Sequence, residues 1–143
     1  MPQSFNKIWI HAIWATKYRE PVIELDIEQK VHRFMSDQLR EHGCPVRIIN
    51  GMPDHVHCLF LQNPKKSISE IIKQVKGSTS FYVNQNELIK GEFSWQKGYG
   101  AYSVSESGVE RVFQYIKNQK RHHQRKSFQK ESERFCHLHG IAT

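Results

Sequence analysis

The sequence of 143 residues has no apolar run long enough to cross a membrane. A membrane-spanning helix needs about 20 consecutive apolar residues, and the longest apolar stretches, such as residues 8–14, fall well short of that length. Residues 1–7 also lack the apolar segment of a signal peptide. We therefore expect a cytoplasmic protein that makes no contact with a membrane.

Cysteine and acidic residues are also scarce. Cys44, Cys58 and Cys136 are odd in number and form no CxxC pair, so neither a disulfide framework nor a structural zinc site is expected. The 14 acidic residues are outnumbered by 21 lysines and arginines, which leaves a net charge of +7. Residues 117–130 carry six basic side chains and no acidic one. This imbalance favours a polyanionic partner, although a basic helix face can also be merely solvated.

The spacing of the apolar residues is that of a globular domain. A length of 143 residues with 38% hydrophobic residues fits a single domain spanning residues 1–143. β-Branched and aromatic residues, or alternating apolar ones, indicate strands over residues 5–18, 46–50, 55–62 and 93–105, the last broken near Gly98. Apolar residues at three- and four-residue intervals predict helices over residues 25–42, from 67 or 69 to 82, from about 108, and over 127–138.

The order strand, helix, strand, strand, helix, strand predicts an α+β fold. It is typical of the ferredoxin-like, or RRM-like, split βαβ sandwich, in which an antiparallel sheet carries two helices on one face. The C-terminal helices are additional to that unit.

Two histidines in the third predicted strand are candidates for metal binding. His55 and His57 flank Val56, and because side chains alternate along a strand, both imidazoles project from one face. Two such ligands leave positions open for a third protein group, water and phosphate oxygens. In a chain with nine histidines, the pair can also arise by chance.

A tyrosine and a glutamine on the late helix offer complementary chemistry. Tyr115, Gln119 and His122 follow i, i+4, i+7 spacing and share one helix face. Tyr115 is a candidate nucleophile toward phosphorus, although a phenol with a pKa of about 10 needs activation. Gln119 could complete a metal shell through its oxygen. The alternatives are that Tyr115 packs in the core and that Gln119 is solvated.

Three stretches together resemble a known family. They are Trp14-Ala15-Thr16-Lys17-Tyr18-Arg19, Asp54-His55-Val56-His57 and Tyr115-Ile116-Lys117-Asn118-Gln119. In this order and spacing the chain is similar to the single-tyrosine transposases of small bacterial insertion sequences, which include the REP-associated tyrosine transposases. These enzymes belong to the superfamily named for its His-hydrophobe-His (HUH) motif.

The resemblance implies a specific activity. It implies that His55, His57 and Gln119 hold Mg²⁺ or Mn²⁺, and that Tyr115 on the C-terminal helix cuts single-stranded DNA and becomes linked to the 5′ phosphate. The freed 3′ hydroxyl then rejoins strands without a nucleotide cofactor. It further implies DNA hairpins as substrates, and homodimers in which the tyrosine helix of one subunit completes the histidine site of the other.

Several further residues are candidates for supporting roles. His11 in the first predicted strand either hydrogen-bonds near the site or is a half-buried structural histidine. The candidates for nucleic-acid contacts are Lys17, Arg19, Lys73, Lys76 and Arg121.

Other functions share parts of this pattern. Lys97-Gly98-Tyr99-Gly100 matches the start of the RNA-binding octamer of RRM domains, but residues 101–104 do not supply its aromatic ending. An RRM-like module without catalysis would also leave His55, His57 and Tyr115 without roles. A relaxase or replication initiator shares the HUH chemistry but is usually a larger protein.

Overall fold

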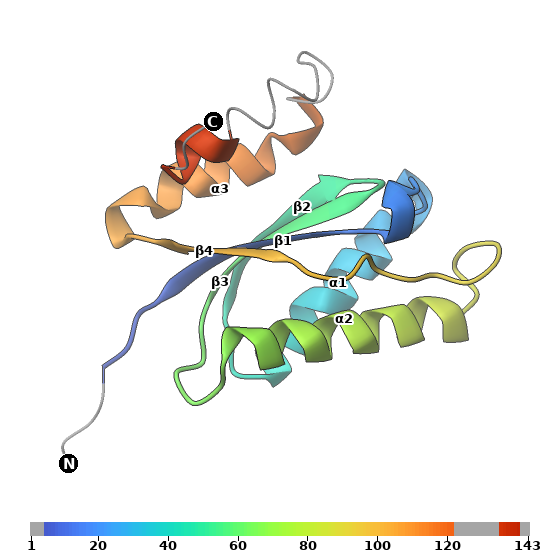
Figure 1. Ribbon diagram of the computed structural model, residues 1–143, viewed down its shortest axis with the longest axis horizontal. Coiled ribbons are helices and arrows are strands. Elements are labelled where there is room, and N and C mark those ends of the chain that lie inside the picture. Colours follow the sequence, from blue (N-terminus) through green and yellow to red (C-terminus); the bar gives the residue numbers. More distant parts are fainter. Residues whose placement is uncertain (1–4, 122–134, 141–143) are drawn as a thin grey trace.

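A four-stranded antiparallel sheet forms the centre of the computed structural model, which describes residues 5–121 and 135–140 (Figure 1). Its strands are β1 (Trp9–Ala15), β2 (Val46–Met52), β3 (His55–Leu61) and β4 (Gly100–Val104). They lie in the order β2-β3-β1-β4. In this order β3 lies between β1 and β2, and β1 lies between β3 and β4. The two βαβ units are thus interleaved, which confirms the predicted ferredoxin-like fold.

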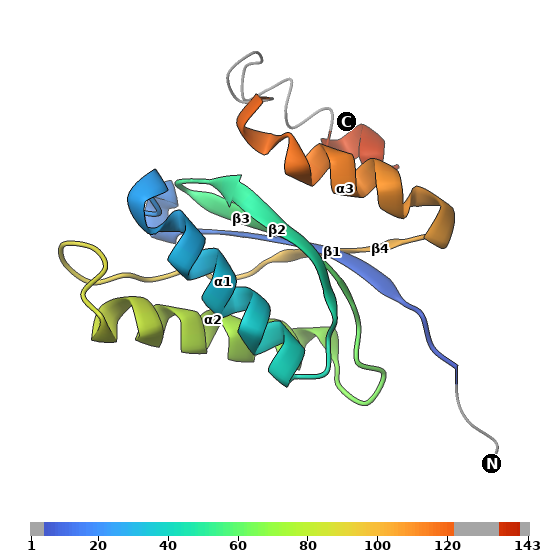
Figure 2. The same ribbon diagram turned by 180° about the vertical axis from the view of Figure 1, so that it is seen from behind.

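Two long helices cover one face of the sheet (Figure 2). They are α1 (Leu25–Glu41) and α2 (Ile68–Gln85). The side chain of Ser67 caps α2 by accepting a hydrogen bond from the Glu70 amide, a preferred arrangement at helix N-termini. The main core lies between these helices and the sheet, and β3 contributes Val56, Cys58 and Phe60 to it.

The third helix, α3 (Val109–Lys117), packs on the opposite face of the sheet (Figures 1 and 2). A short 3-10 turn, η2 (Glu106–Gly108), leads into it from β4. The buried stripe of α3 forms a second, smaller core with Leu59 of β3 and consists of Val109, Val112, Tyr115 and Ile116. Val56, Cys58 and Phe60 of β3 face α1 and α2. Because side chains alternate along a strand, the two histidines of β3 lie on the opposite face, which α3 covers.

Two predicted strands are shorter in the structure than the sequence indicated. The first strand was predicted over residues 5–18, but β1 ends at Ala15 and a 3-10 turn, η1 (Lys17–Arg19), follows. Tyr18 and Arg19 there have positive φ, which is incompatible with a strand. The strand predicted over residues 93–105 is only Gly100–Val104, because Gly98 has a φ of 87° and turns the chain. Trp95 still forms an isolated bridge with Thr16.

Part of the C-terminal prediction lies outside the described residues. Of the helix predicted over residues 127–138, the structure describes residues 135–138, which are helical. His122 also lies outside the described residues. Within the described part of the chain, no helix is both long and apolar enough to cross a membrane.

Candidate active site

The two histidines of β3 lie on the face of the sheet that α3 covers. His55 is 4% exposed and His57 is 1% exposed, while the intervening Val56 belongs to the core on the other face. Their ring centroids are 5.2 Å apart. The strand alternation predicted from the sequence therefore brings both imidazoles to one place.

Tyr115 on α3 and Gln119, which follows the C-terminal end of α3, lie against these histidines. The Tyr115 ring lies edge-on to the His57 ring, with 5.6 Å between their centroids. The Gln119 Oε1 atom lies 3.4 Å from His55 Nε2. Gln119 is fully buried, so the alternative that it is solvated is wrong. Tyr115 is 4% exposed and contributes to the small core as well as to the cluster.

The C-terminal end of α3 is fastened to the rest of the fold by polar contacts. Asn50 of β2 donates from Nδ2 to the carbonyl oxygens of Ile116 and Lys117, at 3.0 and 3.2 Å. These carbonyls lie in the last turn of the helix, where side-chain donors often bind carbonyl oxygens. Lys120 donates to the carboxylate of Glu28 on α1 and to Asn50 Oδ1, each at 2.9 Å. These contacts hold the C-terminal end of α3, and the residues that follow it, against β2 and α1. Gln119 lies in this held segment.

Asp54 orients the first histidine. Its Oδ1 lies 2.8 Å from His55 Nδ1, and Arg19 Nε donates to its Oδ2 at 3.2 Å. The hydrogen bond from His55, helped by Arg19, lowers the pKa of Asp54 to about 2. The carboxylate can then only accept, so His55 donates from Nδ1, and the neutral form of His55 carries its lone pair on Nε2, on the side of Gln119. Asp54 was not predicted as a site residue, although it stands directly before His55 in the motif.

His11 contacts the second histidine. It lies on β1, is fully buried, and its Nε2 is 2.9 Å from His57 Nδ1. Its other nitrogen, Nδ1, is 2.6 Å from His139 Nε2. Burial, with His139 nearby, lowers the pKa of His11 to about 3. Of the two alternatives for His11, hydrogen bonding next to the site is the one observed.

The donor set at the centre of the cluster consists of two imidazoles and one amide oxygen. Nitrogen and neutral oxygen donors suit a divalent ion such as Mn²⁺, and the set leaves positions for phosphate oxygens. The positions of His55 Nε2 and Gln119 Oε1 fit this use, because the two atoms lie 3.4 Å apart. Within residues 5–121 and 135–140, no group of three or more His, Cys, Asp or Glu side chains is arranged to hold a metal ion.

Comparison with known proteins assigns the family. The family described as "Transposase IS200 like" matches residues 4–119, a span that includes His55, His57, Tyr115 and Gln119. The chain belongs to the IS200-like transposases. It is accordingly assigned to DNA-cleaving and strand-transferring enzymes that function in transposition, and not to RNA-recognition modules.

Individual relatives agree with this assignment. The transposase is 29% identical to the ISDra2 transposase TnpA of Deinococcus radiodurans over 114 residues, which cover 76% of this chain and 81% of the relative. A crystal structure described as a putative transposase from the same organism is 28% identical, with a TM-score of 0.66 over 83% of this chain and 98% of the other. A REP-associated tyrosine transposase bound to a REP hairpin is 14% identical, with a TM-score of 0.61 over 86% of this chain and 73% of the other. This last likeness concerns the fold.

The basic residues predicted to contact nucleic acid lie on different parts of the transposase. Arg19 lies beside the histidines, with Nη2 3.4 Å from His55 Nδ1. Lys17 is exposed on the same turn, and Arg121 is exposed beyond α3. Lys73 is exposed on α2, on the opposite face of the sheet. Lys73 and Arg19 therefore lie on opposite faces of the sheet.

Lys76 has a structural role that its sequence position did not reveal. Its ammonium group donates to the carbonyl oxygens of residues 96 and 98, at 2.8 and 2.9 Å. Burial lowers its pKa. These bonds fasten the segment before β4 to α2 and use two of the three N–H donors of the Lys76 ammonium group.

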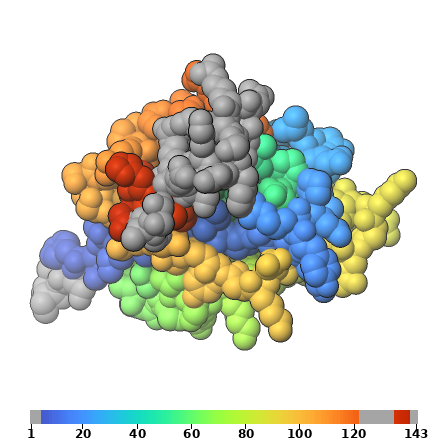
Figure 3. Space-filling model, turned by 45° about the horizontal axis from the view of Figure 1, so that its top comes forward, coloured from blue at the N-terminus to red at the C-terminus, as the bar shows by residue number. Residues whose placement is uncertain are grey.

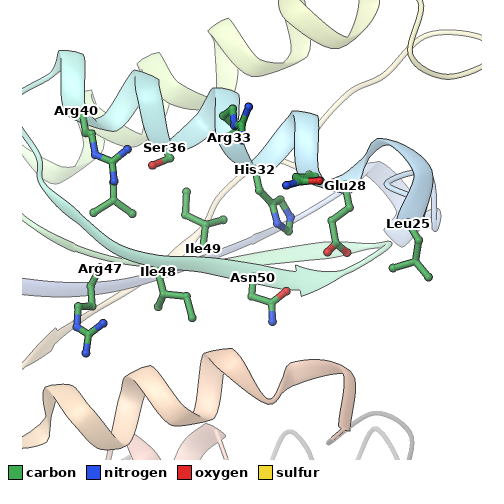
Figure 4. Close-up of a pocket in the computed structure, with 12 residues that line it drawn as sticks. Leu25, Glu28, His32, Arg33, Ser36, Arg40, Arg47, Ile48, Ile49 and Asn50 are labelled. Atoms are coloured by element: carbon green, nitrogen blue, oxygen red, sulfur yellow. The ribbon is translucent and has the colours of Figure 1, made fainter.

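A groove of about 570 Å³ lies between α1 and β2 (Figure 4). Arg33 and Arg40 line it from α1 and Arg47 lines it from β2. The Arg47 guanidinium also stacks on the Phe113 ring of α3, 3.9 Å from its centroid. The groove adds arginines to the basic surface of the transposase that the sequence had not singled out.

Proposed function

We propose that this transposase cuts single-stranded DNA with Tyr115 as the nucleophile and is joined to the DNA through a 5′-phosphotyrosine. The contact between the rings of Tyr115 and His57, 5.6 Å between centroids, carries the proposal. It brings a phenol, which can form a stable phosphate ester, next to the candidate metal ligands; among the residues 5–121 and 135–140, Tyr115 is the side chain of this type that touches His57.

The reaction proceeds in two steps, cleavage and rejoining. In the first, the Tyr115 phenol loses its proton and its oxygen attacks phosphorus; the bond from phosphorus to the 3′ oxygen breaks, and that oxygen leaves as a 3′ hydroxyl. In the second, a 3′ hydroxyl attacks the phosphotyrosine, a new phosphodiester forms and Tyr115 regains its proton. Each step exchanges one phosphate ester bond for another, so no nucleotide cofactor is needed.

His55, His57 and Gln119 are proposed to hold Mg²⁺ or Mn²⁺. A divalent ion bound there would make the phosphorus more electrophilic and stabilise the departing 3′ oxygen. Asp54 keeps His55 in the tautomer that offers its Nε2 lone pair. Arg19, which contacts both Asp54 and His55, adds positive charge where a phosphate would enter. Lys17 and Arg121 are proposed to contact the DNA backbone, and Lys73 to do so from α2.

The proposed substrates are single strands that bear a hairpin. Support comes from the REP-associated relative of similar fold, whose structure contains a REP hairpin, and from the net charge of +7. We expect the protein with Mn²⁺ to cut single strands that carry hairpins from the DNA flanking its gene and to leave the same sequence uncut when fully paired. Gel analysis of end-labelled strands measures this directly.

Salt dependence provides the control for that experiment. Each phosphate neutralised should contribute roughly 0.7–0.9 to the slope of log affinity against log salt, so hairpin binding should weaken steeply as salt rises. Equal cutting of perfect duplex and hairpin strand would contradict the proposed substrate.

The transposase is further proposed to act as a homodimer whose composite sites pair His55 and His57 of one chain with Tyr115 of the other. Two-fold dimers are the commonest assemblies, and two nucleophiles would process both ends of an element together. Within one chain Tyr115 already lies beside His57. The proposal therefore requires α3 to leave its own sheet through rearrangement of the short connection formed by Ser105 and η2.

Mixing two inactive variants distinguishes composite sites from sites within one chain. We expect a mixture of His57→Ala and Tyr115→Phe to recover part of the cleavage activity, because a mixed dimer then contains one intact site and one doubly defective site. If each chain uses its own tyrosine, every site in the mixture carries one defect and no activity returns. Sedimentation of the wild-type protein as a monomer that cuts at full rate would also contradict the dimer.

A further inference from the structure

Three histidine rings form a hydrogen-bonded chain that ends at His57. Its first link joins His57 Nδ1 and His11 Nε2 at 2.9 Å, and its second joins His11 Nδ1 and His139 Nε2 at 2.6 Å. The chain connects three distant parts of the sequence, because His11 lies on β1, His57 on β3 and His139 near the C-terminus. Figure 3 shows this C-terminal segment, in red, beside the orange surface of α3. The proposed function assigns no role to His11 or His139.

The direction of these hydrogen bonds follows from the chemistry of a ligand histidine. A neutral imidazole that binds a metal ion offers a lone pair on one nitrogen and carries its proton on the other. Since His57 Nδ1 faces His11, the metal-binding nitrogen of His57 is Nε2 and the proton lies on Nδ1. His11 Nε2 must then accept. His11 consequently carries its own proton on Nδ1 and donates it to His139 Nε2.

We propose that His11 is a positioning residue for His57, which accepts the Nδ1 proton and so holds the ring in the tautomer and orientation that present Nε2 to a metal ion. The inference rests on the proposed function, because it takes His57 to be a ligand. The complete burial of His11 supports it: a buried imidazole is neutral and can accept, whereas an imidazolium has no lone pair to offer.

The site then orients its two ligand histidines with different acceptors. His55 donates to the carboxylate of Asp54 at 2.8 Å, whereas His57 donates to a neutral imidazole. A carboxylate raises the basicity of its ligand more strongly and adds a negative charge. Using an imidazole for the second ligand fixes its tautomer without a second negative charge near the incoming phosphate.

The tautomer of His57 in the metal-free protein gives the first test. Long-range ¹H–¹⁵N correlation spectra of the full, ¹⁵N-labelled chain distinguish a protonated Nδ1 from a protonated Nε2. We expect His57 and His11 both to carry the proton on Nδ1. A proton on His57 Nε2 would overturn the inference, since His11 would then be the donor. This test needs neither a variant nor activity.

Substitution of His11 gives the second test, with Mn²⁺ binding measured by titration of the metal-free protein. His11→Phe keeps a planar ring but removes the acceptor, and it should weaken Mn²⁺ binding about 10- to 100-fold, as loss of such partners does. His11→Gln restores one acceptor and one donor and should recover most of the affinity. His42→Phe, which removes an imidazole at the far end of α1, should bind like the wild type.

The outcomes separate the two proposals. If the wild-type protein binds Mn²⁺ and His11→Phe binds it equally well, His11 has no positioning role while the metal site stands. If His11→Gln binds as weakly as His11→Phe, the acceptor is not what matters and the inference is also overturned. If the wild-type protein binds no Mn²⁺, the proposed metal site itself fails.

Discussion

Replacing Tyr115 by Phe should abolish DNA cleavage and the covalent protein–DNA adduct while the fold and hairpin binding persist. The change removes only the phenolic oxygen, and the ring can keep its packing against His57. Because no other group in the cluster can form the ester, we expect a loss of at least about 10³-fold in cleavage rate, comparable to removal of other covalent nucleophiles. Denaturing gels of labelled hairpin strands measure both cleavage and adduct.

A second tyrosine provides the matched control. Tyr82 stacks on Phe34, with ring centroids 4.2 Å apart, and lies with α2 on the face of the sheet opposite to the site. Tyr82→Phe makes the same chemical change outside the cluster and should cut DNA like the wild type. An adduct formed by Tyr115→Phe would show that another residue attacks the phosphate.

Replacing His57 by Ala should remove metal binding and, with it, cleavage. Loss of a partner that only orients a ligand costs about 10- to 100-fold in metal affinity, so loss of the ligand itself should exceed that range. Gln119→Ala removes a neutral oxygen donor and should cause a smaller loss that excess Mn²⁺ restores. Titration with Mn²⁺ and cleavage assays at increasing Mn²⁺ concentration distinguish these two responses.

His42→Ala controls for the removal of an imidazole, and thermal unfolding checks that the buried change at His57 leaves the protein folded. Cleavage by the wild-type protein at full rate in excess EDTA would contradict the metal-dependent mechanism, whatever the variants do.

The sequence predicted the parts of the site that depend on local periodicity. Strand alternation placed His55 and His57 on one face, and helical spacing placed Tyr115 and Gln119 on another. That these two faces meet followed from the family resemblance and is seen in the contact between Gln119 and His55. The element order likewise predicted the sheet, because short connections leave few ways to arrange it.

What the sequence did not predict depends on contacts between distant residues. The hydrogen bonds that join His11 with His57 and with His139 span 46 and 128 residues, and no local pattern encodes them. The bonds of Lys76 to residues 96 and 98 are hidden for the same reason, since a lysine on a helix face looks solvated until its neighbours are known. The early end of β1 depends on the positive φ of Tyr18 and Arg19, for which their side chains give no signal.

The central claim is that Tyr115 becomes linked to DNA, and peptide mapping of the adduct tests it most directly. Wild-type protein is incubated with hairpin-bearing single strands and Mn²⁺, the adduct is digested with protease and nuclease, and the linked peptide is identified by mass spectrometry. We predict a nucleotide joined through its 5′ phosphate to the peptide that contains Tyr115. A nucleotide on any other residue, or cleavage that proceeds with no adduct at all, would contradict the proposed mechanism.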